Sequence, residues 1–389
     1  MTSPRKIWRF ALLVMFAMLA QSARGQDKQP AAKGIDKAVI AAYEKLGAQY
    51  GSVTKLREYD WHQFMPLPPV AGLSVPCFRF KTFPEAKLPE VGVPFGLDLD
   101  DWQAGDAELK KLAHLKNLVF LGLKDTQVTD DGLKELKGHK DLAALDLWRT
   151  RITDAGLKEL VVLKNLVALD LNFTDVSDAG LSDLAPLKGL RKIALTNTQI
   201  TDAGLKDLAG FKKLGHLIVA GTLVTDGGLK ELAPLKELST LGLDDTVVTN
   251  AGLKELAPLK YLEQLSLGYT QITDEGLKEL GIFKRLALIQ LPGTQITDAG
   301  LKNLASMTNL QGLVLDRTNI SDAGLKELAP LKNLRTLSLD TTQVTDAGLK
   351  DLAANHKKLN AVFLGGTQVT DAGAAELRKA LPRCSVSVR

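Results

Sequence analysis

The sequence has little of what small exported domains or metal centres require. It contains only two cysteines, Cys77 and Cys384, and five histidines in 389 residues. Two cysteines are too few for a disulfide framework, and neither lies in a CxxC motif. The histidines occur singly, without HExxH or His-x-His spacing. The chain also lacks a nucleophile elbow and a phosphate-binding glycine loop. We therefore expect neither catalysis, nor a metal, nor a cofactor.

Aromatic residues and net charge are also low. Aromatics make up 5% of the chain and the formal net charge is +4, so the charge points to neither nucleic acid nor a membrane surface. The chain is 45% hydrophobic and 24% charged, which excludes disorder. After residue 20 no apolar run is long enough to span a bilayer, so no membrane span is expected in the mature protein.

The N-terminus has the pattern of a secretory signal. Arg5, Lys6 and Arg9 precede an apolar run over residues 10–20, and small and polar residues follow as far as Gly25. This pattern predicts a signal peptide over residues 1–25 and a protein that is secreted or held in the periplasm or cell envelope. Retention of the segment as an uncleaved anchor is the alternative.

A 24-residue repeat covers most of the chain. Its first leucine recurs regularly, at Leu118, Leu142, Leu166, Leu190, Leu214, Leu238, Leu262, Leu286, Leu310 and Leu334. One extra residue near Asn355 moves the next start to Leu359, and the register extends back to Pro94. Each unit passes from Leu-x-Leu alternation, typical of a strand, to Leu-x-x-Leu spacing, typical of a helix face. The sequence therefore predicts an α/β solenoid, a horseshoe of about twelve units with a concave parallel sheet and convex helices. Cys77 and Cys384 then fall at opposite ends, too far apart for a disulfide.

Two polar columns follow the strand leucines. The ninth position is almost always Thr, as at Thr150 and Thr174, and is expected to bond backbone groups at the strand exit. A Thr-Asp-Ala-Gly-Leu motif then suits a helix start, where the Asp carboxylate opposes the positive end of the helix dipole. Each unit supplies only one such Asp, which makes a calcium site the weaker interpretation.

The pattern Leu-x-x-Leu-x-Leu-x-x-Thr-x-Ile/Val-Thr-Asp-x-Gly-Leu resembles the leucine-rich repeat superfamily, especially its ribonuclease-inhibitor-like, F-box-associated and GALA-like branches. It is also similar to exported bacterial proteins built from near-identical repeats. The resemblance implies a recognition scaffold, although a fold does not fix a function. Thr replaces the usual Asn at the ninth position. Relatives with an F-box recognise substrates for ubiquitin ligases, but no F-box is found here, so that role is not transferred.

The resemblance and the N-terminal pattern together give three parts: the signal peptide (residues 1–25), a capping segment (26–93) and the leucine-rich repeat domain (94–389). A helix is expected near residues 36–48, and a last strand at residues 385–388. Residues 65–94 are rich in proline and aromatics and are expected to cover the first apolar face of the solenoid. A ligand site in this segment is the alternative.

Residues between and after the strand leucines should face the concave side, where the repeats differ most. Trp148, Arg149 and Phe173 stand on neighbouring strands about 5 Å apart and belong to residue types that dominate binding hot spots. His216, Tyr269 and Arg317 complete the predicted ligand-binding set. We expect a protein partner here, with a glycan as the second choice. Scattered surface residues without a partner, and a protein that assembles with itself through its outer faces, are the competing interpretations.

Overall fold

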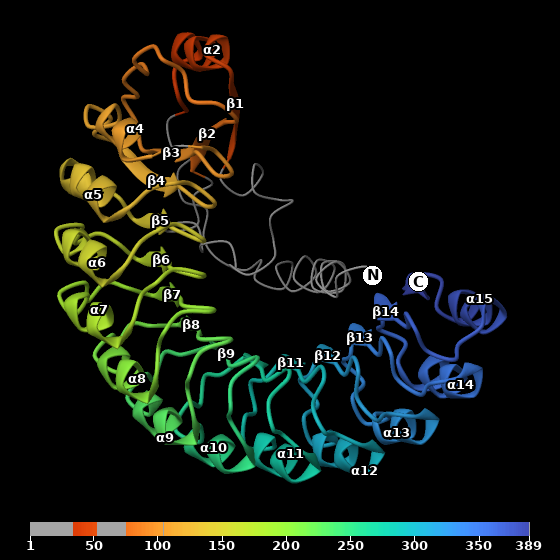
Figure 1. Cartoon of the computed structure of the whole chain (residues 1–389). Helices are drawn as coiled ribbons and strands as arrows, with labels where there is room; N and C mark the ends of the chain where they lie inside the picture. The colour runs from red at the N-terminus through yellow and green to blue at the C-terminus, as the bar shows by residue number, and fades with distance from the viewer. Residues whose placement is uncertain (1–33, 53–74, 104, 389) are drawn as a thin grey trace. The chain divides into compact units, whose positions relative to one another are not determined.

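The computed structural model describes residues 34–52, 75–103 and 105–388. The predicted signal peptide lies outside these residues. The chain divides into two compact units, one ending at Thr222 and the other running from Leu223 to the C-terminus. Each unit is described by itself. In both, strands line one side and helices the other (Figure 1).

The first unit opens with an antiparallel pair of strands and continues as a parallel sheet. Strand β1 pairs antiparallel with β2, and β2 to β8 are parallel. The strands are β1 (Ala48–Ser52), β2 (Pro76–Phe80), β3 (Phe95–Asp98), β4 (Leu118–Gly122), β5 (Ala144–Asp146), β6 (Ala168–Asp170), β7 (Lys192–Ala194) and β8 (His216–Ile218). The helices are α2 (Lys37–Lys45), α4 (Asp106–Lys110), α5 (Asp130–Leu133), the 3-10 helix η3 (Lys134–Gly138), α6 (Asp154–Leu160), α7 (Asp178–Asp183) and α8 (Asp202–Leu208).

The second unit repeats the same pattern with parallel strands only. Its strands are β9 (Thr240–Gly242), β10 (Gln264–Ser266), β11 (Leu288–Gln290), β12 (Gly312–Val314), β13 (Thr336–Ser338), β14 (Ala361–Phe363) and β15 (Ser385–Ser387). Its helices are α9 (Asp226–Leu229), η4 (Lys230–Leu232), α10 (Asn250–Glu255), α11 (Asp274–Leu280), α12 (Asp298–Leu301), η5 (Lys302–Leu304), α13 (Asp322–Glu327), α14 (Asp346–Asn355) and α15 (Asp371–Ala380). In each unit the predicted order of strand, turn, helix and return loop is confirmed. Among the described residues, no helix has the length and apolar character needed to cross a bilayer.

The leucine columns form the core, and the ninth-position threonines close each strand exit. Leu145, Leu147 and Leu169 are buried, as are their equivalents in the other repeats. The hydroxyl of Thr150 donates to the carbonyl of Leu147 at 2.6 Å, and the hydroxyl of Thr174 does the same to Leu171. The predicted structural role of the threonine column is therefore confirmed.

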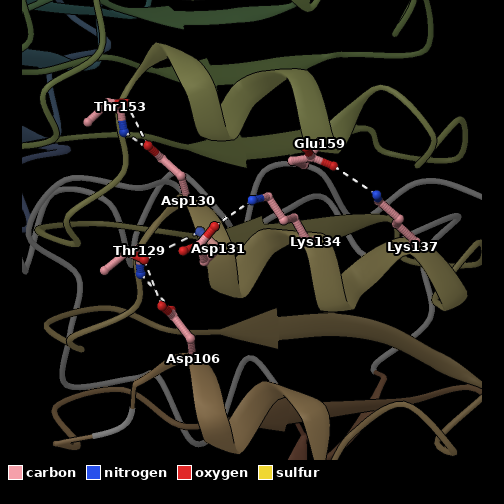
Figure 2. Close-up of polar contacts among 8 residues, drawn as sticks. All are labelled: Asp106, Thr129, Asp130, Asp131, Lys134, Lys137, Thr153 and Glu159. Carbon is pink, nitrogen blue, oxygen red and sulfur yellow. Dashed lines mark hydrogen bonds and ion pairs between the residues drawn. The ribbon is translucent and has the colours of Figure 1, made fainter.

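The helix-start aspartates bond to the next repeat as well as lying at their own helix. Thr153 donates its amide to one oxygen of Asp130 at 2.9 Å and its hydroxyl to the other at 2.6 Å (Figure 2). Thr129 contacts Asp106 in the same way. The helix itself is capped by the threonine, because the Thr153 hydroxyl oxygen accepts the amide of Ala155 at 3.2 Å. The carboxylate therefore joins consecutive repeats, which the sequence analysis did not anticipate. We call this column the aspartate ladder.

The glycine of the motif makes room for this ladder. A Cβ built on Gly204 would lie 2.4 Å from the Oδ1 atom of Asp178, and one on Gly180 would lie 2.3 Å from that of Asp154. Such distances are far inside van der Waals contact. Any larger residue would displace a carboxylate oxygen that is hydrogen-bonded to the next repeat, so glycine here is a packing requirement.

Asn250 interrupts the ladder in the second unit. Its Oδ1 atom accepts the amide of Thr273 at 3.0 Å, but its Nδ2 donates to the Thr273 hydroxyl at 2.8 Å. The direction of the second hydrogen bond is therefore reversed. Thr273 makes no side-chain hydrogen bond that caps α11, whereas Thr249 caps α10.

The N-terminal helix α2 packs against the first strands. Tyr43 of α2 lies parallel to Phe78 with ring centroids 3.9 Å apart, and its hydroxyl donates to the carbonyl of Pro89 at 2.9 Å. Burial raises the pKa of Tyr43. The predicted helix is present, over residues 37–45. Cys77 and Cys384 are both buried, and no disulfide joins them.

Two histidines replace core residues in the column just after the helix. His139 and His356 are buried where other repeats place Leu163, Leu235 or Phe283. Burial lowers the pKa of both, that of His356 to about 4. Both imidazoles are therefore neutral at pH 7.

Restoring the ladder should stabilise the protein. We expect Asn250→Asp to raise the free energy of unfolding by about 1 kcal/mol, because charge-assisted hydrogen bonds are stronger and the Thr273 hydroxyl can then cap α11. Asp178→Asn should cost a similar amount. Urea denaturation of both variants checks this, and a loss of stability in Asn250→Asp would contradict it.

Replacing His356 should remove part of the acid sensitivity. The unfolded state takes up a proton below the ordinary pKa of 6.5, whereas the folded state takes it up only near pH 4. The stability that the neutral His356 imidazole contributes is therefore fully present above pH 6.5 and is lost as the pH falls toward 4. Between pH 7 and pH 4, we expect the free energy of unfolding to fall by on the order of 2 kcal/mol less in His356→Leu than in wild type. Thermal melting of both proteins across this range checks this. An equal loss of stability in the two proteins would refute the assignment.

Candidate functional site

The residue just before each ninth-position threonine adopts a left-handed backbone. Described non-glycine examples in the repeats have φ between 53° and 59°; they are Asp125, Arg149, Phe173, Asn197, Asp245, Tyr269, Arg317 and Thr341. Gly221, Gly293 and Gly366 occupy the same position in other repeats, with φ between 64° and 70°. The amide of Arg149 donates to the carbonyl of Asn172 in the next repeat at 2.8 Å, which holds the turn. We call this position the turn column.

Bulky side chains are expensive in the turn column. The left-handed conformation costs a residue with a Cβ atom roughly 1–2 kcal/mol, and Asn and Asp tolerate it best. Arg149, Phe173, Tyr269 and Arg317 are therefore kept at a local cost in stability. Backbone strain of this kind clusters at functional sites. All four belong to the predicted ligand-binding set.

Trp148, Arg149 and Phe173 come together as predicted. The Trp148 and Phe173 rings meet edge to face, with centroids 5.2 Å apart. The Arg149 guanidinium lies 4.4 Å from the Trp148 ring centroid and 5.7 Å from that of Phe173. Lys124 places its ammonium 4.8 Å from the Trp148 centroid. We call these four residues the aromatic cluster.

An ion pair fixes the orientation of Arg149. Its guanidinium donates to Asp125 at 3.2 Å, and the Arg149 side chain remains 55% exposed. Burial raises the pKa of Asp125, while the Arg149 charge and hydrogen bond oppose that rise. One edge of the guanidinium is therefore held by the protein, and over half of the side chain stays open to solvent.

His216 lies apart from the aromatic cluster, on β8 directly opposite Lys192 of β7. Burial lowers the pKa of Lys192 to about 7, and burial together with Lys192 lowers that of His216 to about 3. His216 is therefore neutral at pH 7 and can take part in contacts but not as a cation.

Tyr269 and Arg317 belong to the second unit and have different neighbours. The Tyr269 ring covers Gly293 so closely that a Cβ there would lie 2.5 Å from a ring carbon. The charge of Arg317 opposes the rise in pKa of two acidic neighbours, Asp316 and Asp340. Burial raises the pKa of Asp316 to about 6, against the opposing charge of Arg317. Burial also raises the pKa of Asp340. The six predicted residues thus fall into the cluster, the His216 position and these two turns.

Two features of the site escaped the sequence analysis. It missed the left-handed backbone, although the mixture of Gly, Asn, Asp and bulky residues at one position was a usable signal. The contact of Lys124 with the Trp148 ring was not predicted either, because it depends on side-chain direction. Among the described residues, no group of three His, Cys, Asp or Glu side chains could hold a metal ion.

Comparisons with known proteins agree with this architecture. A family model described as Leucine Rich repeat matches residues 162–185 and 259–281. An internalin (inlF) of Listeria monocytogenes is 22% identical, with a TM-score of 0.54 over 77% of this chain and 86% of its own. A leucine-rich repeat protein of Leptospira interrogans is 20% identical, with a TM-score of 0.50 over 75% and 83%. No curated protein sequence matches the chain. These likenesses concern the fold.

Relief of the strained backbone should stabilise the protein. We expect Arg317→Asn to raise the free energy of unfolding by about 0.5–1 kcal/mol, because Asn tolerates the left-handed conformation. Asn197→Arg, the reverse change in the same column, should lower it by a similar amount. Equilibrium unfolding of both variants provides the check. A loss of stability in Arg317→Asn would show that the contacts of Arg317 outweigh its strain.

Proposed function

Because the chain is a leucine-rich repeat protein, we propose that it is a non-catalytic scaffold that binds a partner protein at the aromatic cluster. One observation supports this most strongly. Arg149 and Phe173 are held in a costly left-handed backbone and pack with Trp148 into one partly exposed surface. A residue kept at a cost to stability requires a gain elsewhere, and binding supplies one.

The chemistry of the aromatic cluster suits a protein surface. Trp, Arg and aromatic side chains contribute most of the energy at protein interfaces. Trp148 and Phe173 offer apolar faces, whereas Arg149 and Lys124 offer positive charge. The rings and the guanidinium already contact one another before binding, so little side-chain entropy is lost on association. A partner with an acidic residue beside an apolar one would match this surface. A sugar ring stacked on Trp148 is the glycan version of the same proposal.

Export belongs to the proposal as well. Residues 1–25 have the pattern of a signal peptide, which would place the protein in the periplasm, in the envelope or outside the cell. The partner would then be an envelope or extracellular protein.

Self-assembly is the competing function. Tyr261 and Ile282 of the second unit are 50% and 41% exposed on loops that lead from helix to strand. Apolar side chains at such places suit contacts between copies of a repeat protein. This alternative predicts that the protein captures itself rather than a different chain.

The test uses the mature protein from Gln26 onward, immobilised and exposed to native envelope and culture-medium fractions. We expect one or a few proteins to be retained by wild type and lost from a Trp148→Ala, Arg149→Ala, Phe173→Ala variant. The dissociation constant of the identified partner should rise about 100-fold or more, because each hot-spot truncation costs about 2 kcal/mol.

An Asn197→Ala, Thr341→Ala variant is the matched control, since both residues are exposed members of the turn column. It should retain the partner. Equal capture by the cluster variant and wild type would remove the aromatic cluster as the site, and recovery of the protein alone would favour self-assembly.

A further inference from the structure

Exposed lysines recur where each helix returns to the next strand. In the first unit they are Lys116, Lys140, Lys164, Lys188 and Lys212, and in the second Lys236, Lys260, Lys284, Lys332 and Lys357. Each lies two positions before the first leucine of a repeat, so the row follows the edge of the sheet at which the strands begin. We call three positions of each repeat the lysine edge: the second and the first residue before the first leucine, and the residue after it.

Several of these ammonium groups are held in place. Lys116 donates to the carbonyl of Ala113 at 2.7 Å, Lys212 to that of Ala209 at 2.7 Å, and Lys284 to that of Gly281 at 2.6 Å. These carbonyls lie at the end of the helical turn, where a cation is favourable. Each ammonium has three donors and uses one of them here. The bond fixes the charge but leaves it available to a ligand.

The row is not neutralised by carboxylates. Within the part of the chain that the structure describes, none of the ten row lysines forms an ion pair. Some lysines on the helices do form ion pairs: Lys137 pairs with Glu159 at 3.2 Å, and Lys134 pairs with Asp131 (Figure 2).

The formal charge of the lysine edge is large in each unit. The first unit has seven cations, which include Arg191 and Lys213, against the single carboxylate of Asp141. The second has eight cations, which include Arg285 and Arg335, against two carboxylates. Each edge therefore carries an excess of six, whereas the whole chain has a net charge of only +4. The remaining residues are net negative, and the small total conceals a separation of charge.

We propose that the lysine edge binds an anionic polysaccharide. Neighbouring strands are about 5 Å apart. The row therefore offers one cation per repeat, except at Thr308, at a spacing close to the length of one sugar in an extended chain. Many weak, exposed ion pairs along a polymer add up through multivalency and counterion release. The partner would be a linear glycan with sulfate or carboxylate groups. This surface is separate from the aromatic cluster, and its failure would leave the proposed function intact.

The composition of the edge favours a polysaccharide over nucleic acid. Single-stranded nucleic acids are bound by aromatic side chains on which bases stack. Among the edge residues only Tyr261 is aromatic, and the Arg285 guanidinium lies 4.4 Å from its ring centroid. The predicted export of the protein also places it where polysaccharides occur.

The experiment measures binding of dextran sulfate to the mature protein by calorimetry at several NaCl concentrations, with neutral dextran as the polymer control. We expect saturable binding to dextran sulfate only. A Lys140→Gln, Lys164→Gln, Lys188→Gln variant should bind at least about tenfold more weakly at low salt, and its logarithmic salt dependence should be shallower by about two.

The matched control is Lys134→Gln, Lys158→Gln, Lys206→Gln, which removes the same charge from the helices and should stay within about twofold of wild type. Equal losses in the two variants would overturn a site at the lysine edge, as would absence of binding at physiological salt. Tighter binding of single-stranded or duplex DNA than of dextran sulfate would assign the edge to nucleic acid instead. Circular dichroism melting confirms that all variants fold, and the Trp148→Ala, Arg149→Ala, Phe173→Ala variant should keep full affinity.

Discussion

The array depends on hydrogen bonds that the Thr or Ser before one helix donates to the aspartate at the start of the preceding helix. Both oxygens of Asp154 are used by Ser177, through its amide at 2.8 Å and its hydroxyl at 2.6 Å. These bonds set the distance between repeats on the helical side. The glycine beside each aspartate is then obligatory, and the strands meet in register on the other side. The hydrogen bonds from Thr370 lower the pKa of Asp346, which keeps this carboxylate charged.

Because a few columns carry the architecture, the other positions are free to differ. The turn column has a conformation that glycine satisfies most easily, yet it holds Arg149 and Phe173 beside Trp148. The ladder also places one carboxylate per repeat at the helix starts, whereas lysines gather at the opposite end of each repeat. The proposed recognition surface thus arises from departures from the repeat, whereas the charged edge arises from its regularity.

Most of the fold could be predicted from the sequence, because the 24-residue period alone fixes which leucines face the core. The same period places positions 148, 149 and 173 in adjacent repeats, in the turns that follow β5 and β6, so their proximity could be predicted as well. The partner of each aspartate could not, since a periodic sequence does not say whether Asp130 bonds within its repeat or to Thr153. The cover of Gly293 by Tyr269 and the cation over Trp148 also depend on side-chain directions that spacing does not give. What binds the surface is a property of another molecule.

The reversed hydrogen bond at Asn250 affects how the repeats unfold. In a linear array each repeat touches only its neighbours, so unfolding is cooperative across a junction only as long as that junction is strong. Asn250 gives Thr273 a neutral hydrogen bond in place of a charge-assisted one and leaves α11 without its side-chain cap. The seam between these repeats is therefore where partial opening begins most easily within the second unit. Repeats on either side of the seam can behave as separate folding blocks, although the sequence continues through them without a linker.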